Sequence, residues 1–72
     1  MRNENLLSEI ANGKEVFFEN SFEEVAFRNI PKGGYEAKEK GATPYKVEGA
    51  PNKLVDAILE GKMISKAEYE KY

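Results

Sequence analysis

The stretch of sequence that decides the fold covers residues 30–47 and reads IPKGGYEAKEKGATPYKV. Apolar and charged side chains alternate over residues 35–38 and again over residues 45–48, on either side of a loop that contains a glycine. Neighbouring residues of a strand point to opposite faces of a sheet, so this alternation predicts two strands with one apolar face each. The loop would close a β-hairpin, and Pro44 moves the second strand toward a sheet edge or delays its start.

The same hairpin is rich in lysine and tyrosine, which raises the question of an anionic ligand. A hydrolase phosphate loop needs a helix directly after its glycines, whereas the glycines at positions 33 and 34 lead into a predicted strand. Stacking tyrosines and neutralising lysines could still bind a nucleotide-type anion across an oligomer interface. The alternative is a hairpin with aromatic core residues and solvated lysines. The candidate ligand-binding residues are Lys32, Tyr35, Lys38, Lys40, Tyr45 and Lys46.

A further strand is expected at residues 14–20, KEVFFEN. Its adjacent phenylalanines, Phe17 and Phe18, put an aromatic ring on each face, whereas a strand with one solvated face would alternate apolar and polar residues. Two interpretations of Phe17 stay open. It packs under a helix or at the sheet edge, or it contacts another subunit or a partner.

Residues 21–30 fit two structures. As a strand, Val25 and Phe27 share one face; as a helix, Ser21 and Glu24 form a capping box. We favour the strand, because the segment runs into a proline at position 31 and the residue before a proline avoids helical geometry.

Residues 3–13 predict an N-terminal helix, with Asn3 as its cap and Gly13 in the left-handed position after its end. Four apolar residues fall on one face of this helix, as the helical period requires. They are Leu6, Leu7, Ile10 and Ala11.

Residues 51–72 predict an α-hairpin. Its first helix begins near Pro51 or Asn52, ends at Gly61 and carries an amphipathic stripe. The stripe consists of Leu54, Val55, Ile58 and Leu59. Ser65 and Glu68 form a capping box for a short second helix, and Ile64 with Tyr69 occupy the positions of a hydrophobic staple.

This tail resembles the short C-terminal helical hairpin domain known as SHOCT. The pattern of that family is a helix, a glycine, an apolar residue, threonine or serine, and then an acidic residue and an aromatic. Here it is carried by Leu59, Gly61, Ile64, Ser65, Glu68 and Tyr69. The family's longer, lysine-rich second helix has no counterpart in this sequence. The resemblance implies a role in oligomerisation or interaction rather than in catalysis.

The amino-acid composition argues against several classes of function. The 72 residues contain no cysteine and no histidine, so disulfides, zinc sites and the usual base partners of a hydroxyl nucleophile are absent. The adjacent carboxylates of Glu23 and Glu24 would point to opposite faces of a strand, and no spacing matches a calcium loop. We therefore expect neither an enzyme nor a bound metal or cofactor.

The net charge of −2 is unevenly distributed, with five basic and two acidic side chains over residues 28–46 and an acidic first third. Sequence-independent binding to nucleic acid needs clustered cations, so we expect none. No apolar run is long enough to cross a membrane and no signal-peptide core is present, so we expect a cytoplasmic protein.

The sequence thus predicts one small α+β domain over residues 1–72. Residues 1–50 would form a helix and an antiparallel sheet of three or four strands, and residues 51–72 the α-hairpin. Short chains without cysteine or histidine and rich in lysine, glutamate and asparagine resemble the accessory and inhibitor proteins of bacteriophages and mobile elements. We therefore expect a non-enzymatic inhibitor that occupies a host macromolecule. We also expect it to be oligomeric, because so small a core contributes little stability by itself.

Two alternatives stay open beside this inhibitor. One is an oligomeric sponge for an anionic nucleotide-type ligand, and the other is a structural oligomerisation module. The candidate interface residues are Phe17, Phe22, Leu54, Ile58 and Tyr69.

Overall fold

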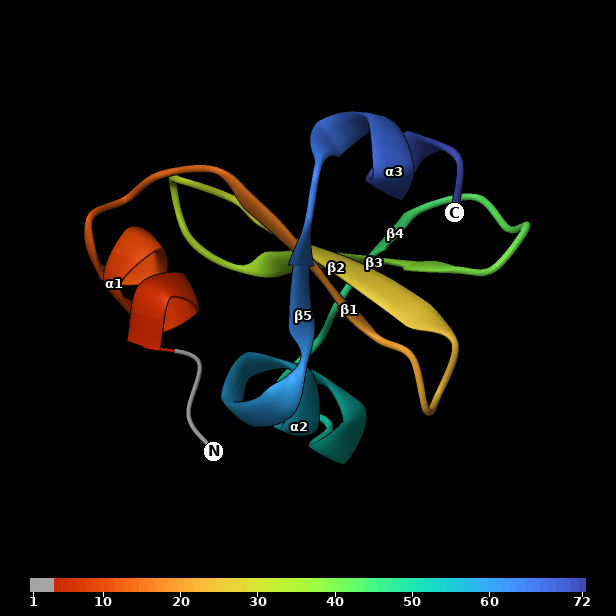
Figure 1. Cartoon of the computed structure of the whole chain (residues 1–72), viewed down its shortest axis with the longest axis horizontal. Helices are drawn as coiled ribbons and strands as arrows, with labels where there is room; N and C mark the ends of the chain where they lie inside the picture. The colour runs from red at the N-terminus through yellow and green to blue at the C-terminus, as the bar shows by residue number, and fades with distance from the viewer. Residues whose placement is uncertain (1–3) are drawn as a thin grey trace.

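A computed structural model describes residues 4–72, which form a single antiparallel sheet with helices on both of its faces (Figure 1). The elements in chain order are α1 (Glu4–Ala11), β1 (Val16–Asn20), β2 (Val25–Asn29), β3 (Tyr35–Glu39), β4 (Tyr45–Lys46), α2 (Asn52–Glu60), β5 (Lys62–Ile64) and α3 (Lys66–Glu70). The α+β class and the N-terminal helix are confirmed. Gly13 follows α1 with a φ of +76°, as predicted, whereas the predicted cap Asn3 lies outside the described residues.

The sheet has five strands in the order β4-β3-β2-β1-β5, rather than three or four. Strands β1 to β4 form a meander in which each neighbour is antiparallel. The hairpin predicted from residues 30–47 is confirmed, because Ala37 of β3 lies opposite Tyr45 of β4. The strand interpretation of residues 21–30 is also confirmed for β2, which a four-residue turn connects to β1.

The predicted C-terminal α-hairpin is wrong. Helices α2 and α3 are separated by β5, which pairs with β1 so that Phe17 lies opposite Ile64. Gly61 ends α2 in extended geometry, with φ −76° and ψ −178°, and not in the left-handed conformation of a helix reversal. A Cβ atom on Gly61 would lie 2.4 Å from the carbonyl oxygen of Ala57 and 2.5 Å from that of Glu19. The chain therefore passes from α2 directly into the sheet at a point where only glycine fits.

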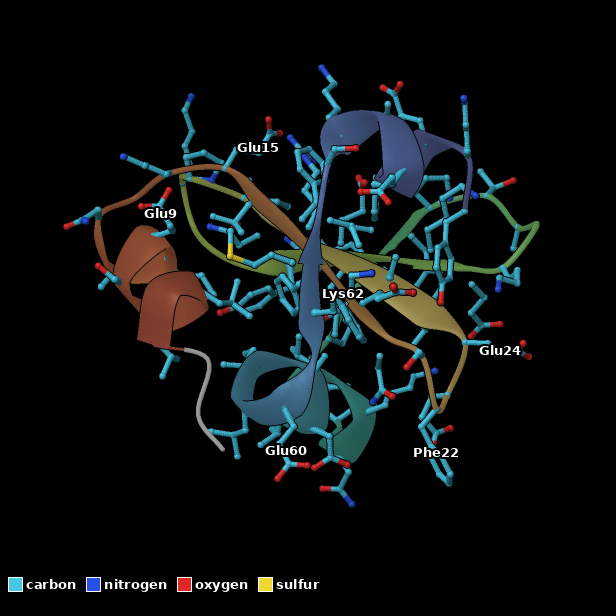
Figure 2. All side chains as sticks on the ribbon, viewed as in Figure 1. Glu9, Glu15, Phe22, Glu24, Glu60 and Lys62 are labelled. Carbon is cyan, nitrogen blue, oxygen red and sulfur yellow. The ribbon has the colours of Figure 1, made fainter. Side chains whose placement is uncertain are left out.

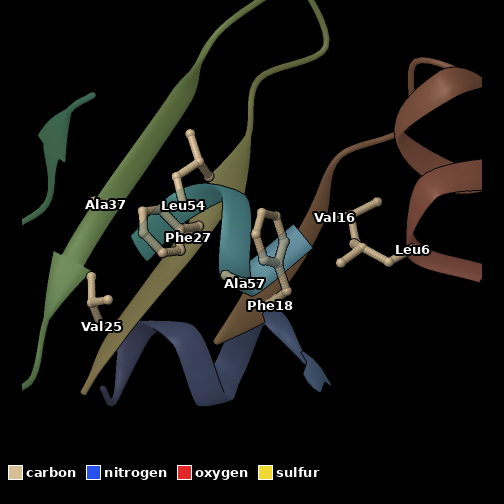
Figure 3. Close-up of a cluster of buried hydrophobic side chains, with 8 residues drawn as sticks. All are labelled: Leu6, Val16, Phe18, Val25, Phe27, Ala37, Leu54 and Ala57. Atoms are coloured by element: carbon tan, nitrogen blue, oxygen red, sulfur yellow. The ribbon is translucent and has the colours of Figure 1, made fainter. Parts of the chain in front are cut away.

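One face of the sheet, here called the α2 face, carries the main core beneath α1 and α2 (Figure 3). The rings of Phe18 and Phe27 stack at a centroid distance of 5.7 Å, and both side chains are fully buried. The eight buried residues of this core are Leu6, Val16, Phe18, Val25, Phe27, Ala37, Leu54 and Ala57. Val55 and Leu59 of the predicted stripe stay outside it, 39% and 42% exposed, because α2 contacts the sheet through its Leu54 and Ala57 side.

The opposite face, here called the α3 face, holds a smaller core made by Phe17, Ala26 and Tyr69. The rings of Phe17 and Tyr69 lie 5.1 Å apart, so Phe17 packs under a helix, as the first of its two interpretations proposed. The predicted capping box starts α3: the Ser65 side chain accepts from the Glu68 backbone N–H, and the Glu68 carboxylate accepts from that of Ser65.

A row of charged groups continues the α3 face beyond its small core. Arg28 donates to Glu15 and lies 3.5 Å from Glu36, whose carboxylate also accepts a hydrogen bond of 2.8 Å from the Tyr69 hydroxyl. Hydrogen bonding to Glu15 raises the pKa of Arg28. The α3 face is thus covered by one aromatic contact and a polar network rather than by a second apolar layer.

Candidate protein-binding site

The most exposed large apolar side chain among the described residues is Phe22, which is 91% exposed at the turn between β1 and β2. Figure 2 shows its ring projecting from the end of this hairpin, with Glu24 on the same hairpin. An exposed phenylalanine contributes nothing to the core, so stability gives no reason for its position. We call residues 21–24, with Phe22 as their apolar member, the Phe22 tip.

The Phe22 tip is fixed to the body of the protein by Asn20, which is only 7% exposed. The Asn20 side-chain oxygen accepts from the Glu23 backbone N–H at 3.1 Å and so closes the turn. Its amide nitrogen donates to the backbone oxygen of Lys53, in the first turn of α2, also at 3.1 Å. One buried side chain therefore ties the tip to α2 and fixes the backbone of the turn that carries Phe22.

Glu24 completes the turn in the left-handed region, with a φ of +54°. This conformation costs a residue with a side chain roughly 1 kcal/mol, because its Cβ atom approaches the following carbonyl. A backbone hydrogen bond from Lys40 in the neighbouring loop, 3.2 Å long, satisfies the Glu24 carbonyl oxygen. The turn is thus a defined conformation supported from two sides.

An open groove of about 330 Å³ lies between the tip and the end of α2, with Gly61 at its base. Asp56 and Glu60 of α2 line it together with Lys62 of β5. The groove is therefore lined by two carboxylates and the ammonium group of Lys62, and Glu23 and Glu24 follow Phe22 in the tip. The arrangement is an aromatic side chain with an acidic rim.

The six candidate residues of the lysine–tyrosine hairpin do not come together. Tyr35 turns its ring toward Phe18 in the main core, and the Tyr45 hydroxyl donates to Glu39 on the same face. Lys38 lies on the α3 face opposite Ala26 and is 9% exposed.

The remaining lysines lie still further apart. Lys46 is exposed on the α3 face opposite Glu36, and Lys40 stands 5.1 Å over the ring of Tyr72. Lys32 lies in the turn before β3, at the other end of that strand from Lys40. A ligand site made from all six residues would need more than one chain.

The five candidate interface residues also separate. Phe17, Leu54 and Tyr69 are buried within one chain, at 8%, 2% and 4% exposure, because they cover the two faces of the sheet. Ile58 is half-buried against the main core. Phe22 alone of the five presents its whole ring to solvent.

Sequence reasoning identified Phe22 and missed what supports it. The sequence pattern places Asn20 at the end of the strand expected over residues 14–20, although an asparagine that precedes a turn by one residue is a signal for side-chain closure of that turn. The acidic side of α2 gave no signal, because it faces the tip only once the chain has folded.

Residues 4–72 contain no helix with the length and apolar character that a membrane span requires. Within the same residues, no group of three acidic side chains is arranged to hold a metal ion.

Comparison of the chain with family models, with curated proteins and with solved structures finds no match.

Proposed function

We propose that this chain is a non-enzymatic, cytoplasmic binding protein that acts by occupying another protein, with the Phe22 tip as its anchor. The observation that carries this proposal is the combination of a 91% exposed aromatic ring with a turn that the buried Asn20 holds in one conformation. Binding energy at protein interfaces is concentrated in a few aromatic or arginine side chains that fill a pocket on the partner. A turn whose backbone is already held in one conformation loses little backbone entropy on association.

The rim of the tip points to the chemistry of the partner. Asp56 and Glu60 line the groove beside Phe22, and two glutamates follow it in the tip, so we expect a complementary surface to carry lysine or arginine side chains around an apolar pocket. Charged rims mainly steer association and reject surfaces of the same sign. The composition resembles that of phage and mobile-element inhibitors, and blocking a cationic surface of a host protein would suit such a role.

The experiment compares three immobilised chains: the wild type, Phe22→Asp, and Tyr45→Asp as a control. Tyr45 is a 43% exposed aromatic on the far edge strand, so its variant also replaces an exposed ring with a carboxylate, away from the tip. Proteins that are captured from cells by the wild type and by the control are purified, and their affinities are then measured by calorimetry. We expect Phe22→Asp to weaken binding at least about 30-fold, the loss for a hot-spot aromatic worth about 2 kcal/mol.

Two further measurements complete this test. Thermal melting of Phe22→Asp should match the wild type, because the replaced ring has no core contacts to lose. Affinity should fall as salt is raised, in keeping with the acidic rim. Equal affinity of the wild type and Phe22→Asp for every captured protein would refute the proposal.

A further inference from the structure

The turn that carries Phe22 contains a residue in an unfavourable backbone conformation. Among residues 4–72, Glu24 is the one residue other than glycine with a positive φ, at +54°. Gly41, in the neighbouring loop between β3 and β4, has a φ of +77°. Glycine adopts this left-handed geometry at no steric cost, whereas the Cβ atom of any other L residue opposes it. A glycine at position 24 would therefore close the turn more easily than glutamate does.

The contacts of Glu24 within the chain give no reason for its side chain. Its backbone oxygen accepts a hydrogen bond from the Lys40 N–H, and glycine would accept the same bond. Glu24 is exposed, and its carboxylate takes no part in the ion pairs and side-chain hydrogen bonds found among residues 4–72. Burial and hydrogen bonding to Glu19 raise the pKa of Tyr72, and the charge of Glu24 adds to this shift by disfavouring the phenolate. That repulsion is absent while the phenol is neutral, so it gives Glu24 no stabilising partner.

The place of Glu24 beside the exposed ring suggests a role in binding instead. Unfavourable backbone conformations are concentrated at sites that bind or react. Glu24 lies two residues after Phe22, in the turn that Asn20 closes (Figure 2). Once the ring enters a pocket on a partner, the neighbouring carboxylate loses water, and its attraction to an opposite charge strengthens.

We propose that Glu24 selects the partner, because its carboxylate pairs with a lysine or arginine side chain that borders the apolar pocket for Phe22. This inference rests on the proposed function. It adds one residue that distinguishes a pocket with a cation at its edge from an apolar pocket without one.

Stability and binding should then respond in different directions to changes at position 24. Glu24→Gly removes both the carboxylate and the backbone cost, so the melting temperature should rise while the affinity falls. Glu24→Gln keeps the length of the side chain and the backbone cost. Its melting temperature should equal that of the wild type, while its affinity falls about five- to tenfold. A residue with a purely structural role would change stability and affinity together.

The probe for binding is a protein that the wild type and Tyr45→Asp capture from cells and Phe22→Asp does not. Calorimetry measures the affinity of this purified protein for each variant at low and at high salt. The loss in Glu24→Gln should be smaller at high salt, because salt already screens the pair in the wild type.

Glu48→Gln is the matched control for charge. Glu48 is exposed and follows Val47, whose N–H donates to Tyr35 at the end of β3 that is remote from the tip. Its variant makes the same change of charge and should bind the probe as tightly as the wild type does.

Differential scanning calorimetry measures the melting temperatures, with Glu23→Gly as the control for the backbone. Glu23 lies in the same turn without a positive φ, so glycine should lower the melting temperature there. A lower melting temperature for Glu24→Gly overturns the proposal, and so does wild-type affinity in Glu24→Gln. An equal loss in Glu48→Gln also overturns it, since the effect would then be one of net charge.

The outcomes separate this inference from the proposed function. If Phe22→Asp loses a captured protein that Glu24→Gln binds as tightly as the wild type, the proposed function stands and only the role of Glu24 fails. If no captured protein distinguishes the wild type from Phe22→Asp, the proposed function fails and this inference fails with it.

Discussion

The two faces of the sheet are covered in different ways. The α2 face holds one continuous apolar core, with the stacked rings of Phe18 and Phe27 beneath two helices. The α3 face has a single aromatic contact, between Phe17 and Tyr69, beside a network of charged groups around Arg28. This contrast shows how a chain of 72 residues covers both faces of one sheet. The second cover is a five-residue helix started by a capping box, and it needs little apolar sequence.

The largest effect should come from shortening one aromatic side chain on each face. Phe27→Ala removes a fully buried ring from the main core and should cost about 3–5 kcal/mol of unfolding free energy. Small domains have little more than this to lose, so the variant should be mostly unfolded. Phe17→Ala, at the 8% exposed contact with α3, should cost about 3 kcal/mol or less and leave the chain folded. Urea unfolding followed by circular dichroism measures both, and equal costs would show that the two faces are energetically equivalent.

The sequence predicted the α2 face better than the α3 face, for a physical reason. Alternation over residues 35–38 and 45–48 reports which side of a strand is buried, and it was enough to predict the hairpin. Strand β5 has three residues, too few for a period, and lies between two segments with helical signals. Its place in the sheet depends on the approach of Gly61 to the end of β1, a contact that no local pattern encodes.

The next effect concerns the point where the chain crosses from one face to the other. Gly61→Ala should destabilise the fold by about 1–3 kcal/mol, because the new methyl group would overlap two backbone oxygens that cannot rotate away. Loss of glycine from the unfolded chain would by itself stabilise the fold by about 0.4–1 kcal/mol, so the overlap has to exceed that gain.

Differential scanning calorimetry gives the sign of the Gly61→Ala effect. Gly13→Ala provides the contrast, since its site is open and only its φ of +76° opposes a side chain. A higher melting temperature for Gly61→Ala would contradict the close approach of α2 and β5, and with it the explanation for the missing α-hairpin.

The candidate site, like the fold, could be predicted from the sequence only in part. The sequence named Phe22 as one of five candidate interface residues, and the structure exposes its ring. The lysine–tyrosine hairpin was misleading as a cluster, because residues that alternate along a strand point to opposite faces. Tyr35 and Lys38, three positions apart in β3, lie on different sides of the sheet for this reason.

The smallest expected effect is a loss of stability at high pH, and it arises from two tyrosines of the α3 face. Burial, followed by hydrogen bonding to Glu36, raises the pKa of Tyr69. Burial and a hydrogen bond to Glu19 raise the pKa of Tyr72 to about 12, against about 10 for a free tyrosine. The folded state therefore holds both phenolic protons more tightly than the unfolded state does. Their contribution to stability is complete below about pH 10 and is lost as the pH rises toward the folded-state pKa.

Thermal melting between about pH 9 and pH 12, with the tyrosine ring signals followed by NMR, measures this loss. Tyr69→Phe should cost about 1 kcal/mol at neutral pH through its missing hydrogen bond and should flatten the alkaline decline. The matched variant Tyr45→Phe removes a hydroxyl on the opposite face, whose hydrogen bond to Glu39 is exposed, and should cost less than Tyr69→Phe at neutral pH. If Tyr69 and Tyr72 both titrated at the usual value, the α3 face would be open to solvent and would not be a true second cover. The contrast between the two faces would then be one between a core and a surface.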